Sequence, residues 1–176
     1  MKTLDHAIGS YEAACLMGVH FTQPKRMAER GLLTTRTFAQ NDGGNDARIV
    51  AIFSRDECEK DYEEYDERYK ANGGQTERRP RSCIPLRAGA LRALAKMEHQ
   101  IPFGDAIGTY DAAKILGVHF TLVSRLVTQK KIVGRILYSK RAGAQRSWIF
   151  SRASCEREKA RNAIATGIPG RKRSSS

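Results

Sequence analysis

The strongest constraint on the fold is an internal repeat. The segment AIGSYEAACLMGVHFT at 7–22 recurs as AIGTYDAAKILGVHFT at 106–121, so the two starts differ by 99 residues. The similarity resumes with FSRDECE at 53–59 and FSRASCE at 150–156, whose starts differ by 97 residues. Self-similarity of this kind is typical of a chain built from two copies of one structural unit. We therefore predict two small domains with separate cores.

The change of offset predicts a loop between the matched segments. Insertions and deletions between well-matched segments usually fall in surface loops, and the intervening runs QNDGGNDAR (40–48) and SKRAGAQR (139–146) carry glycine and polar residues. Runs rich in β-branched and aromatic residues flank both loops, as strands of a hairpin would. These runs are TTRTF (34–38) and ARIVAIF (47–53) in copy one, and VGRILYS (133–139) and RSWIF (146–150) in copy two.

Each copy also has two short helical patterns before its hairpin. Ser10 and Thr109 are expected to cap the first helix, which Gly18 and Gly117 end. The second helix is expected at about 22–30 and 121–129. Its predicted inward residues are Pro24, Met27, Val123 and Leu126.

A third helix is expected after each hairpin. In copy one, Ser54 and Glu57 form an S-x-x-E capping box, and the helix ends near Asn72. In copy two, the matching helix starts at Ser151 and fades toward Gly167. The order in each copy is therefore helix, turn, helix, hairpin, helix.

This order and its motifs resemble the winged helix-turn-helix domain of the MerR and excisionase superfamily. The resemblance rests on Y-E-A-A-x-L-M-G-V-H at 11–20, followed by ten residues and then Gly-Leu-Leu at 31–33. Histidine replaces the usual serine at positions 20 and 119, and Lys130-Lys131-Ile132 replaces Gly-Leu-Leu in copy two. The resemblance implies two DNA-binding domains in tandem. MerR regulators usually add a long dimerisation helix and an effector domain, and we do not expect either in this sequence.

The predicted fold class is mainly α with small β-hairpin wings (α+β), in two tandem winged helix-turn-helix domains. Copy one spans 1–72, a basic linker 73–85, a linker helix with copy two 86–166, and a basic disordered tail 167–176. The linker helix has one apolar stripe, which consists of Leu86, Ala90, Leu91, Leu94 and Met97.

The charge of the chain points to a polyanionic partner. The net charge is +12, and it is unevenly shared. Residues 1–74 contain 10 Lys and Arg against 13 Asp and Glu, whereas 75–176 contain 21 against 6. Copy two should therefore dominate attraction to phosphates.

The composition also bears on location. No apolar run approaches the roughly 20 residues that span a bilayer, and the first residues do not resemble a signal peptide. Four cysteines without C-x-x-C spacing favour reduced thiols. We expect a cytoplasmic, nucleoid-associated protein.

Candidate DNA-binding residues lie on the outward face of each second helix, on the wings and in the tail. Arg26 and Arg125 occupy equivalent positions, where arginine could pair with guanine or contact a phosphate. The full candidate set is Thr22, Gln23, Lys25, Arg26, Thr121, Ser124, Arg125, Thr128, Lys130, Lys131, Lys140, Arg141, Arg146, Arg171, Lys172 and Arg173.

Catalytic, cofactor-binding and metal-binding residues are not predicted. His20 and His119 lack a second ligand at metal spacing and are interpreted as structural residues or phosphate contacts. The acidic run of the third helix in copy one is typical of a solvated face rather than of a catalytic carboxylate pair. The chain is expected not to be an enzyme.

The most direct interpretation is a sequence-specific double-stranded DNA-binding protein that regulates transcription. An architectural factor like an excisionase or a partition protein is the first alternative. The second is an adaptor in which the acidic third helix of copy one binds a protein. Because the two copies follow one another in the chain, the expected target is a direct repeat.

Overall fold

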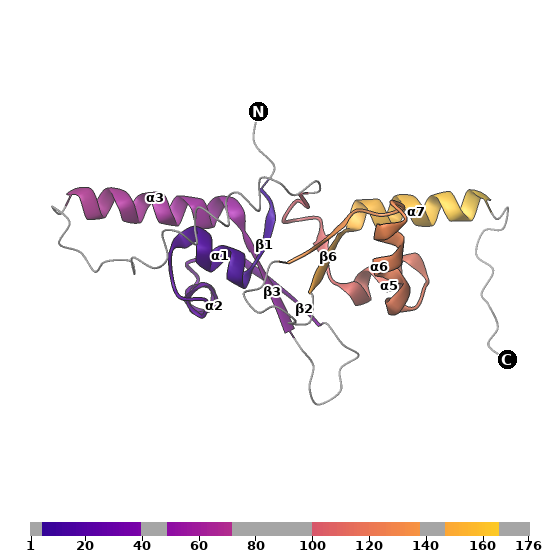
Figure 1. Cartoon of the computed structure of the whole chain (residues 1–176), viewed down its shortest axis with the longest axis horizontal. Coiled ribbons are helices and arrows are strands. Elements are labelled where there is room, and N and C mark those ends of the chain that lie inside the picture. The colour runs from indigo at the N-terminus through magenta and orange to yellow at the C-terminus, as the bar shows by residue number, and fades with distance from the viewer. Residues whose placement is uncertain (1–4, 40–48, 72–99, 138–146, 166–176) are drawn as a thin grey trace.

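The computed structural model describes residues 5–39, 49–71, 100–137 and 147–165 (Figure 1). These parts form a mixed α/β structure in which each repeat contributes three helices and three strands. Copy one contains β1 (Ala7–Gly9), α1 (Ser10–Met17), α2 (Gln23–Glu29), β2 (Thr35–Ala39), β3 (Ile49–Ser54) and α3 (Arg55–Ala71). Copy two contains β4 (Ala106–Ile107), α5 (Thr109–Leu116), α6 (Phe120–Thr128), β5 (Gly134–Ile136), β6 (Trp148–Ser151) and α7 (Arg152–Ala165). The predicted linker helix and tail lie outside the described residues.

Each repeat has one antiparallel sheet, and the two sheets have the same topology. The strand orders are β1-β3-β2 and β4-β6-β5. Thr35 pairs with Phe53 in copy one, and Gly134 pairs with Phe150 in copy two, which are the positions that the offsets of 99 and 97 equate. The predicted hairpin strands are confirmed. The edge strands β1 and β4 were not predicted, because two or three apolar residues give no measurable alternation.

The ends of α1 and α5 confirm one prediction and correct another. Gly18 and Gly117 adopt left-handed conformations with φ of 66° and 68°, where a side chain would be strained. The predicted capping by Ser10 and Thr109 is wrong, because both residues already lie in the first helical turn and glycine occupies each N-cap. Extended strands β1 and β4 lead directly into these helices, which moves each cap one residue earlier than expected.

The third helix of each repeat begins at the predicted serine. Ser54 Oγ accepts a hydrogen bond from the Glu57 backbone N–H at 3.1 Å, and Ser151 Oγ does the same for Ser154 at 3.1 Å. The Glu57 side chain does not complete the predicted capping box. Its carboxylate instead accepts hydrogen bonds from the backbone N–H and hydroxyl of Thr34, at 2.6 and 2.7 Å. This contact joins the start of α3 to the residue that precedes β2.

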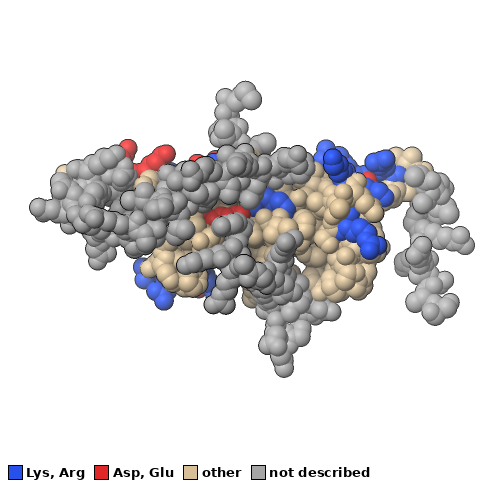
Figure 2. Space-filling view, in the orientation of Figure 1, with Lys and Arg blue, Asp and Glu red and all other residues tan. Residues whose placement is uncertain are grey.

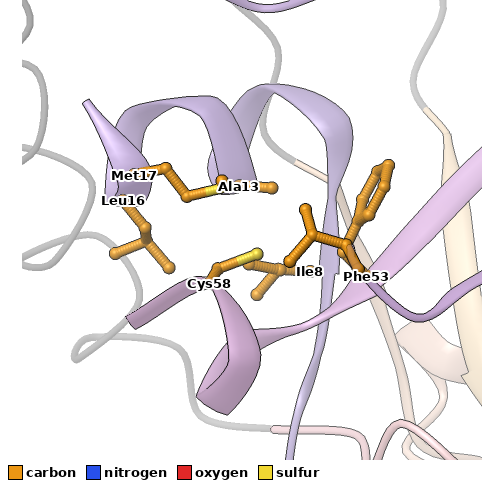
Figure 3. Close-up of a cluster of buried hydrophobic side chains, with 7 residues drawn as sticks. Ile8, Ala13, Leu16, Met17, Phe53 and Cys58 are labelled. Carbon is orange, nitrogen blue, oxygen red and sulfur yellow. The ribbon is translucent and has the colours of Figure 1, made fainter. Parts of the chain in front are cut away.

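Each repeat has its own hydrophobic core, as predicted. In copy one, Ile8, Leu16, Met17 and Phe53 are buried with Cys58 between α1, α3 and the sheet (Figure 3). The core of copy two consists of Ile107, Ala112, Ala113, Val123, Ile132, Phe150 and Cys155. The equivalents of Leu16 and Met17, which are Ile115 and Leu116, are only partly buried against it. Burial raises the pKa of the Cys155 thiol to about 11, and it also raises the pKa of Cys58. Both thiols therefore stay protonated and act as small apolar side chains.

A third core joins the two repeats. Ala7 and Ile52 from copy one pack with their equivalents Ala106 and Ile149 from copy two, together with Ile101 and Leu137. All six side chains are buried. The sheets of the two copies therefore share apolar side chains across the centre of the molecule, between α3 and α7 in Figure 1. The two repeats form one packed body within the described residues.

Candidate nucleic-acid interface

The second helix of each repeat presents a polar face to solvent. Pro24 and Val123 are buried at equivalent positions and hold α2 and α6 against their own cores. Met27 and Leu126 pack on the same cores. The predicted inward residues are therefore confirmed. Because these inward residues recur at helical spacing, they occupy one face of each helix, and the opposite face is left to solvent.

The structure places ten of the predicted site residues on or beside these two faces. Arg26 and Arg125 are exposed at equivalent positions on α2 and α6. The other exposed members are Gln23, Lys25, Thr121, Thr128, Lys130 and Lys131, whereas Thr22 and Ser124 are half-buried. Six members lie outside the described residues: Lys140, Arg141, Arg146, Arg171, Lys172 and Arg173.

The turn before each second helix has the same side-chain hydrogen bond. His20 Nδ1 lies 3.0 Å from Thr22 Oγ1, and His119 Nδ1 lies 2.9 Å from Thr121 Oγ1. Each histidine ring also packs beside the following phenylalanine. Both rings therefore organise the turn that begins the helix, which agrees with the predicted structural role. Within the described ranges, the acidic, cysteine and histidine side chains form no group that could hold a metal ion.

The turn that leads into the hairpin has the same backbone conformation in both repeats despite different residues. Gly31 and Lys130 occupy equivalent positions and have φ of 73° and 56°. Lysine thus occupies a left-handed conformation that costs roughly 1–2 kcal/mol for a residue with a side chain. Leu33 and Ile132, two residues later, are both buried. The replacement of Gly-Leu-Leu in copy two therefore leaves the path of the chain unchanged.

The two repeats meet along a short antiparallel ladder. The Ala7 backbone N–H donates to the Ile101 carbonyl at 2.9 Å, and the Phe103 N–H donates to the Asp5 carbonyl at 2.8 Å. His6 and Pro102 lie between these pairs as an isolated bridge. Residues 101–103 correspond to positions 2–4 of the first copy, so the segment that leads into β1 runs antiparallel to the segment that leads into β4.

Contacts on both sides of this ladder are reciprocal. A Cβ built on Gly9 would lie 3.2 Å from Cβ of Leu137, and one built on Gly108 would lie 2.8 Å from Cβ of Phe38. Gly9 is the equivalent of Gly108, and Phe38 is the equivalent of Leu137. Reciprocal contact between equivalent surfaces defines an isologous, two-fold interface. In Figure 1, α3 and α7 accordingly point in opposite directions, each with its own two short helices beneath it.

This arrangement corrects the expectation that the copies face the same way. The order of the copies in the sequence predicted that the two repeats (heads) face the same way, as binding to a direct repeat requires. The reciprocal contacts instead relate the heads by an approximate two-fold rotation. The physical reason is the burial of apolar side chains. Residues of β1, β4 and the strands beside them pack on one another. Two copies bury the same surface on each side when a two-fold rotation relates them.

A buried ion pair crosses the interface on one side. Arg135 on β5 reaches copy one and contacts the Glu12 carboxylate with Nη1 at 2.8 Å and Nη2 at 2.9 Å. The two side chains are 8% and 1% exposed. Arg135 also donates to the Ala7 carbonyl, and Glu12 accepts from the Gly9 N–H at 2.7 Å. This bidentate geometry satisfies two charges that would otherwise be costly to bury.

The equivalent arginine of copy one makes a different contact. Arg36 Nη1 donates to the carbonyls of Phe103 and Gly104 at 2.8 and 3.1 Å. Asp111 is the equivalent of Glu12 but is exposed. The interface is thus two-fold in its backbone and apolar contacts and asymmetric in its charges.

The surfaces of α3 and α7 differ in charge. Residues 55–71 contain eight acidic and four basic residues, and residues 152–165 contain two acidic and four basic residues. Figure 2 shows acidic side chains over α3 and basic side chains over α7 and at the α2 end of the molecule. The predicted difference in charge between the repeats therefore lies on these two third helices as well as in the flanking segments.

The residues that join the repeats were not identified from the sequence. Glu12 and Arg135 are separated by 123 residues and look like ordinary surface charges in a chain with 28% charged residues. Two features of the sequence could have indicated the interface. Gly9 and Gly108 precede the first helix of each copy, and Arg36 and Arg135 are separated by the repeat offset of 99 residues. A glycine conserved between two repeats indicates close approach by another part of the chain.

Comparison with known proteins identified no relative. The chain matches no family model, and the searches of curated proteins and of solved structures likewise found no match. None of the helices among the described residues is both long enough and apolar enough to span a membrane.

Proposed function

We propose that the protein binds double-stranded DNA in a sequence-specific way, as a regulator of transcription, through two tandem winged helix-turn-helix domains. In each domain α2 or α6 is the recognition helix in the major groove. The hairpins β2–β3 and β5–β6 are the wings, which hold the phosphate backbone. Lys130 and Lys131 at the start of the second wing add phosphate contacts.

One observation carries the proposal. The chain presents two equivalent helices whose buried faces are fixed to a core and whose exposed faces carry Arg26 and Arg125. Two rigid helices with matching exposed arginines, in a chain of net charge +12, suit the regularly spaced base edges and phosphates of a duplex. The two-fold relation of the heads matches the two-fold symmetry of duplex DNA.

The salt dependence of binding tests the proposal. The full chain is titrated against a duplex selected from a random pool, and affinity is followed by fluorescence anisotropy at several salt concentrations. If about six phosphates are neutralised, log K against log salt should have a slope near −5. A slope shallower than about −2 would count against DNA as the main partner.

Matched variants locate the binding surface. The double variant Arg26→Ala with Arg125→Ala removes both exposed arginines of the recognition helices and should abolish selection of a preferred sequence. The control is Arg157→Ala with Lys159→Ala, which removes two exposed charges from α7. The control should retain the preferred sequence. Loss of the preference in the control alone would move the interface to α7.

A further inference from the structure

We propose that one chain binds one inverted repeat whose two half-sites are unequal, with α2 on one half-site and α6 on the other. This inference rests on the proposed function and adds the symmetry and the sequence difference of the target. The two-fold interface within the chain determines the symmetry. The residues that differ between α2 and α6 determine the inequality.

The symmetry follows from the contacts between the repeats. Gly9 lies against Leu137 as Gly108 lies against Phe38, and Ile52 belongs to the same shared core as its own equivalent Ile149. Heads joined by such an isologous surface are related by rotation. Readers with two-fold symmetry bind pseudo-palindromic DNA, because the backbones of a duplex have two-fold axes perpendicular to the helix. A direct repeat would require one head to turn around and leave the shared core.

The interface also supports binding as a single chain. The Glu12–Arg135 ion pair, the short antiparallel ladder and the shared core fix the two heads before DNA is present. A separate dimerisation step, which two-chain readers need, is therefore unnecessary. The expected stoichiometry is one chain for each inverted repeat.

One base pair should be common to both half-sites. Arg26 and Arg125 are exposed at equivalent positions on α2 and α6. Arginine pairs most often with O6 and N7 of guanine in the major groove. The two half-sites should therefore share a guanine at the equivalent position.

Another position should differ between the half-sites. Gln23 of α2 is exposed, and its equivalent on α6 is Leu122, whose exposed fraction is 41%. Glutamine forms paired hydrogen bonds with adenine N6 and N7, whereas an apolar side chain contacts the methyl group of thymine. We therefore assign adenine to the α2 half-site and thymine to the α6 half-site at this position.

Selection of bound duplexes from a random pool, with the full chain, is the first test. The recovered sequence should be an inverted repeat with a shared guanine and one unequal position. A probe with its second half-site turned into a direct repeat should bind at least about tenfold more weakly, because one head then loses its base contacts. Analytical ultracentrifugation of the complex should give one chain for each duplex.

Exchange of the unequal residues is the second test. Gln23→Leu should make the preferred site symmetric, with thymine in both halves, and Leu122→Gln should make it symmetric with adenine. Each variant should lose roughly 5- to 100-fold affinity for the wild-type site and regain it on its matched site. Circular dichroism should be unchanged, because both side chains are at least partly exposed. Lys159→Ala on α7 is the control and should keep the wild-type preference.

The outcomes separate this inference from the proposed function. Salt-dependent binding with equal affinity for inverted and direct repeats would overturn the inference and leave DNA binding intact. Recovery of two identical half-sites by the wild-type chain would overturn the assignment of Gln23 and Leu122. Weak, salt-insensitive binding to every duplex would overturn both proposals.

Discussion

The two repeats have the same backbone fold, but equivalent arginines at the interface between them make different polar contacts. Arg135 crosses into copy one and forms a buried ion pair with Glu12, whereas Arg36 crosses into copy two and donates to two carbonyl groups. Asp111, one methylene shorter than Glu12, remains exposed. The difference shows that the backbone and apolar surfaces set the two-fold arrangement, while charge distinguishes one side from the other.

The same comparison extends to the residues beside the interface. His6 has a buried Nδ1 with no hydrogen-bond partner among the described residues. Its equivalent Asp105 accepts hydrogen bonds from Ser151 Oγ and from the Ala153 N–H. Copy two therefore caps α7 with the carboxylate at this position, whereas copy one has a half-buried imidazole there. In copy one the neighbouring Asp5 accepts from the Asp56 N–H at the start of α3 instead, at 3.2 Å.

The largest expected effect comes from breaking the buried Glu12–Arg135 ion pair. Glu12→Ala leaves the Arg135 guanidinium buried without its carboxylate, and the free energy of unfolding should fall by about 3–5 kcal/mol. Urea denaturation followed by circular dichroism measures the loss. The matched control is Asp111→Ala, which should cost less than about 1 kcal/mol because that carboxylate is exposed in the first turn of α5.

A second variant separates loss of the pair from a general defect. Replacing both Glu12 and Arg135 by apolar residues should be less harmful than Glu12→Ala, since no charge is then left unpaired. Equal losses in Glu12→Ala and Asp111→Ala would show that the ion pair does not stabilise the junction.

The next largest effect tests the functional side of the comparison. Arg125→Ala should weaken specific DNA binding by roughly 1–3 kcal/mol, and Arg26→Ala should weaken it less. The reason is that residues 75–176 have 15 more basic than acidic residues, whereas residues 1–74 have three more acidic than basic residues. Fluorescence anisotropy on the selected site measures both. Equal losses would refute the dominance of copy two.

The pH dependence of stability should reveal the unpaired imidazole. Desolvation, followed by the nearby charge of Arg55, holds the pKa of His6 below its usual value of 6.5. The folded state then binds fewer protons than the unfolded state, so stability is lost as the pH falls below about 6.5. One proton changes the slope by at most about 1.4 kcal/mol per pH unit.

The variant His6→Gln isolates this contribution from that of the neighbouring acids. Asp5 and Asp56 oppose the shift and remain in the variant, as does Arg135. Urea denaturation between about pH 5 and pH 8 should therefore show a shallower slope for His6→Gln than for the wild type. Parallel curves would show that His6 does not titrate differently on folding. His119→Gln is the control at an exposed histidine.

Local sequence signals were sufficient to predict most of each repeat. Gly18 and Gly117 end a helix because only glycine adopts their φ without strain, and the β-branched runs around the glycine loops gave both hairpins. Pro24 and Val123 were correctly placed inward because helical spacing fixes one face once the other is known. Each of these signals acts within about ten residues of the chain.

The junction between repeats could not be predicted, because its contacts connect distant residues. The Ala7 N–H donates to the Ile101 carbonyl, which lies 94 residues later in the chain, and Arg135 reaches Glu12 across 123 residues. Nothing local marks Glu12 as buried, since its neighbours Ala13 and Ala14 predict only an apolar face. The expectation that the two copies face the same way was wrong for this reason: their order along the chain does not determine their relative rotation in space.

The smallest expected effect tests why copy two tolerates lysine where copy one has glycine. Lys130 has a φ of 56°, which costs roughly 1–2 kcal/mol for a residue with a Cβ. Lys130→Gly removes this strain but increases the entropy of the unfolded chain, which costs about 0.4–1 kcal/mol. The net result should be a gain of about 0.5–1 kcal/mol in the free energy of unfolding.

Two controls identify the cause of that gain. Gly31→Ala imposes the same strain on copy one and should cost about 1 kcal/mol; a Cβ there meets nothing within 4 Å, so conformation alone is responsible. Lys131→Gln removes a neighbouring exposed charge and should leave stability nearly unchanged. Both Lys130→Gly and Lys131→Gln should reduce the salt slope of DNA binding by about 1. If Lys130→Gly loses stability while Lys131→Gln does not, the lysine side chain stabilises the turn, and copy two does not merely tolerate it there.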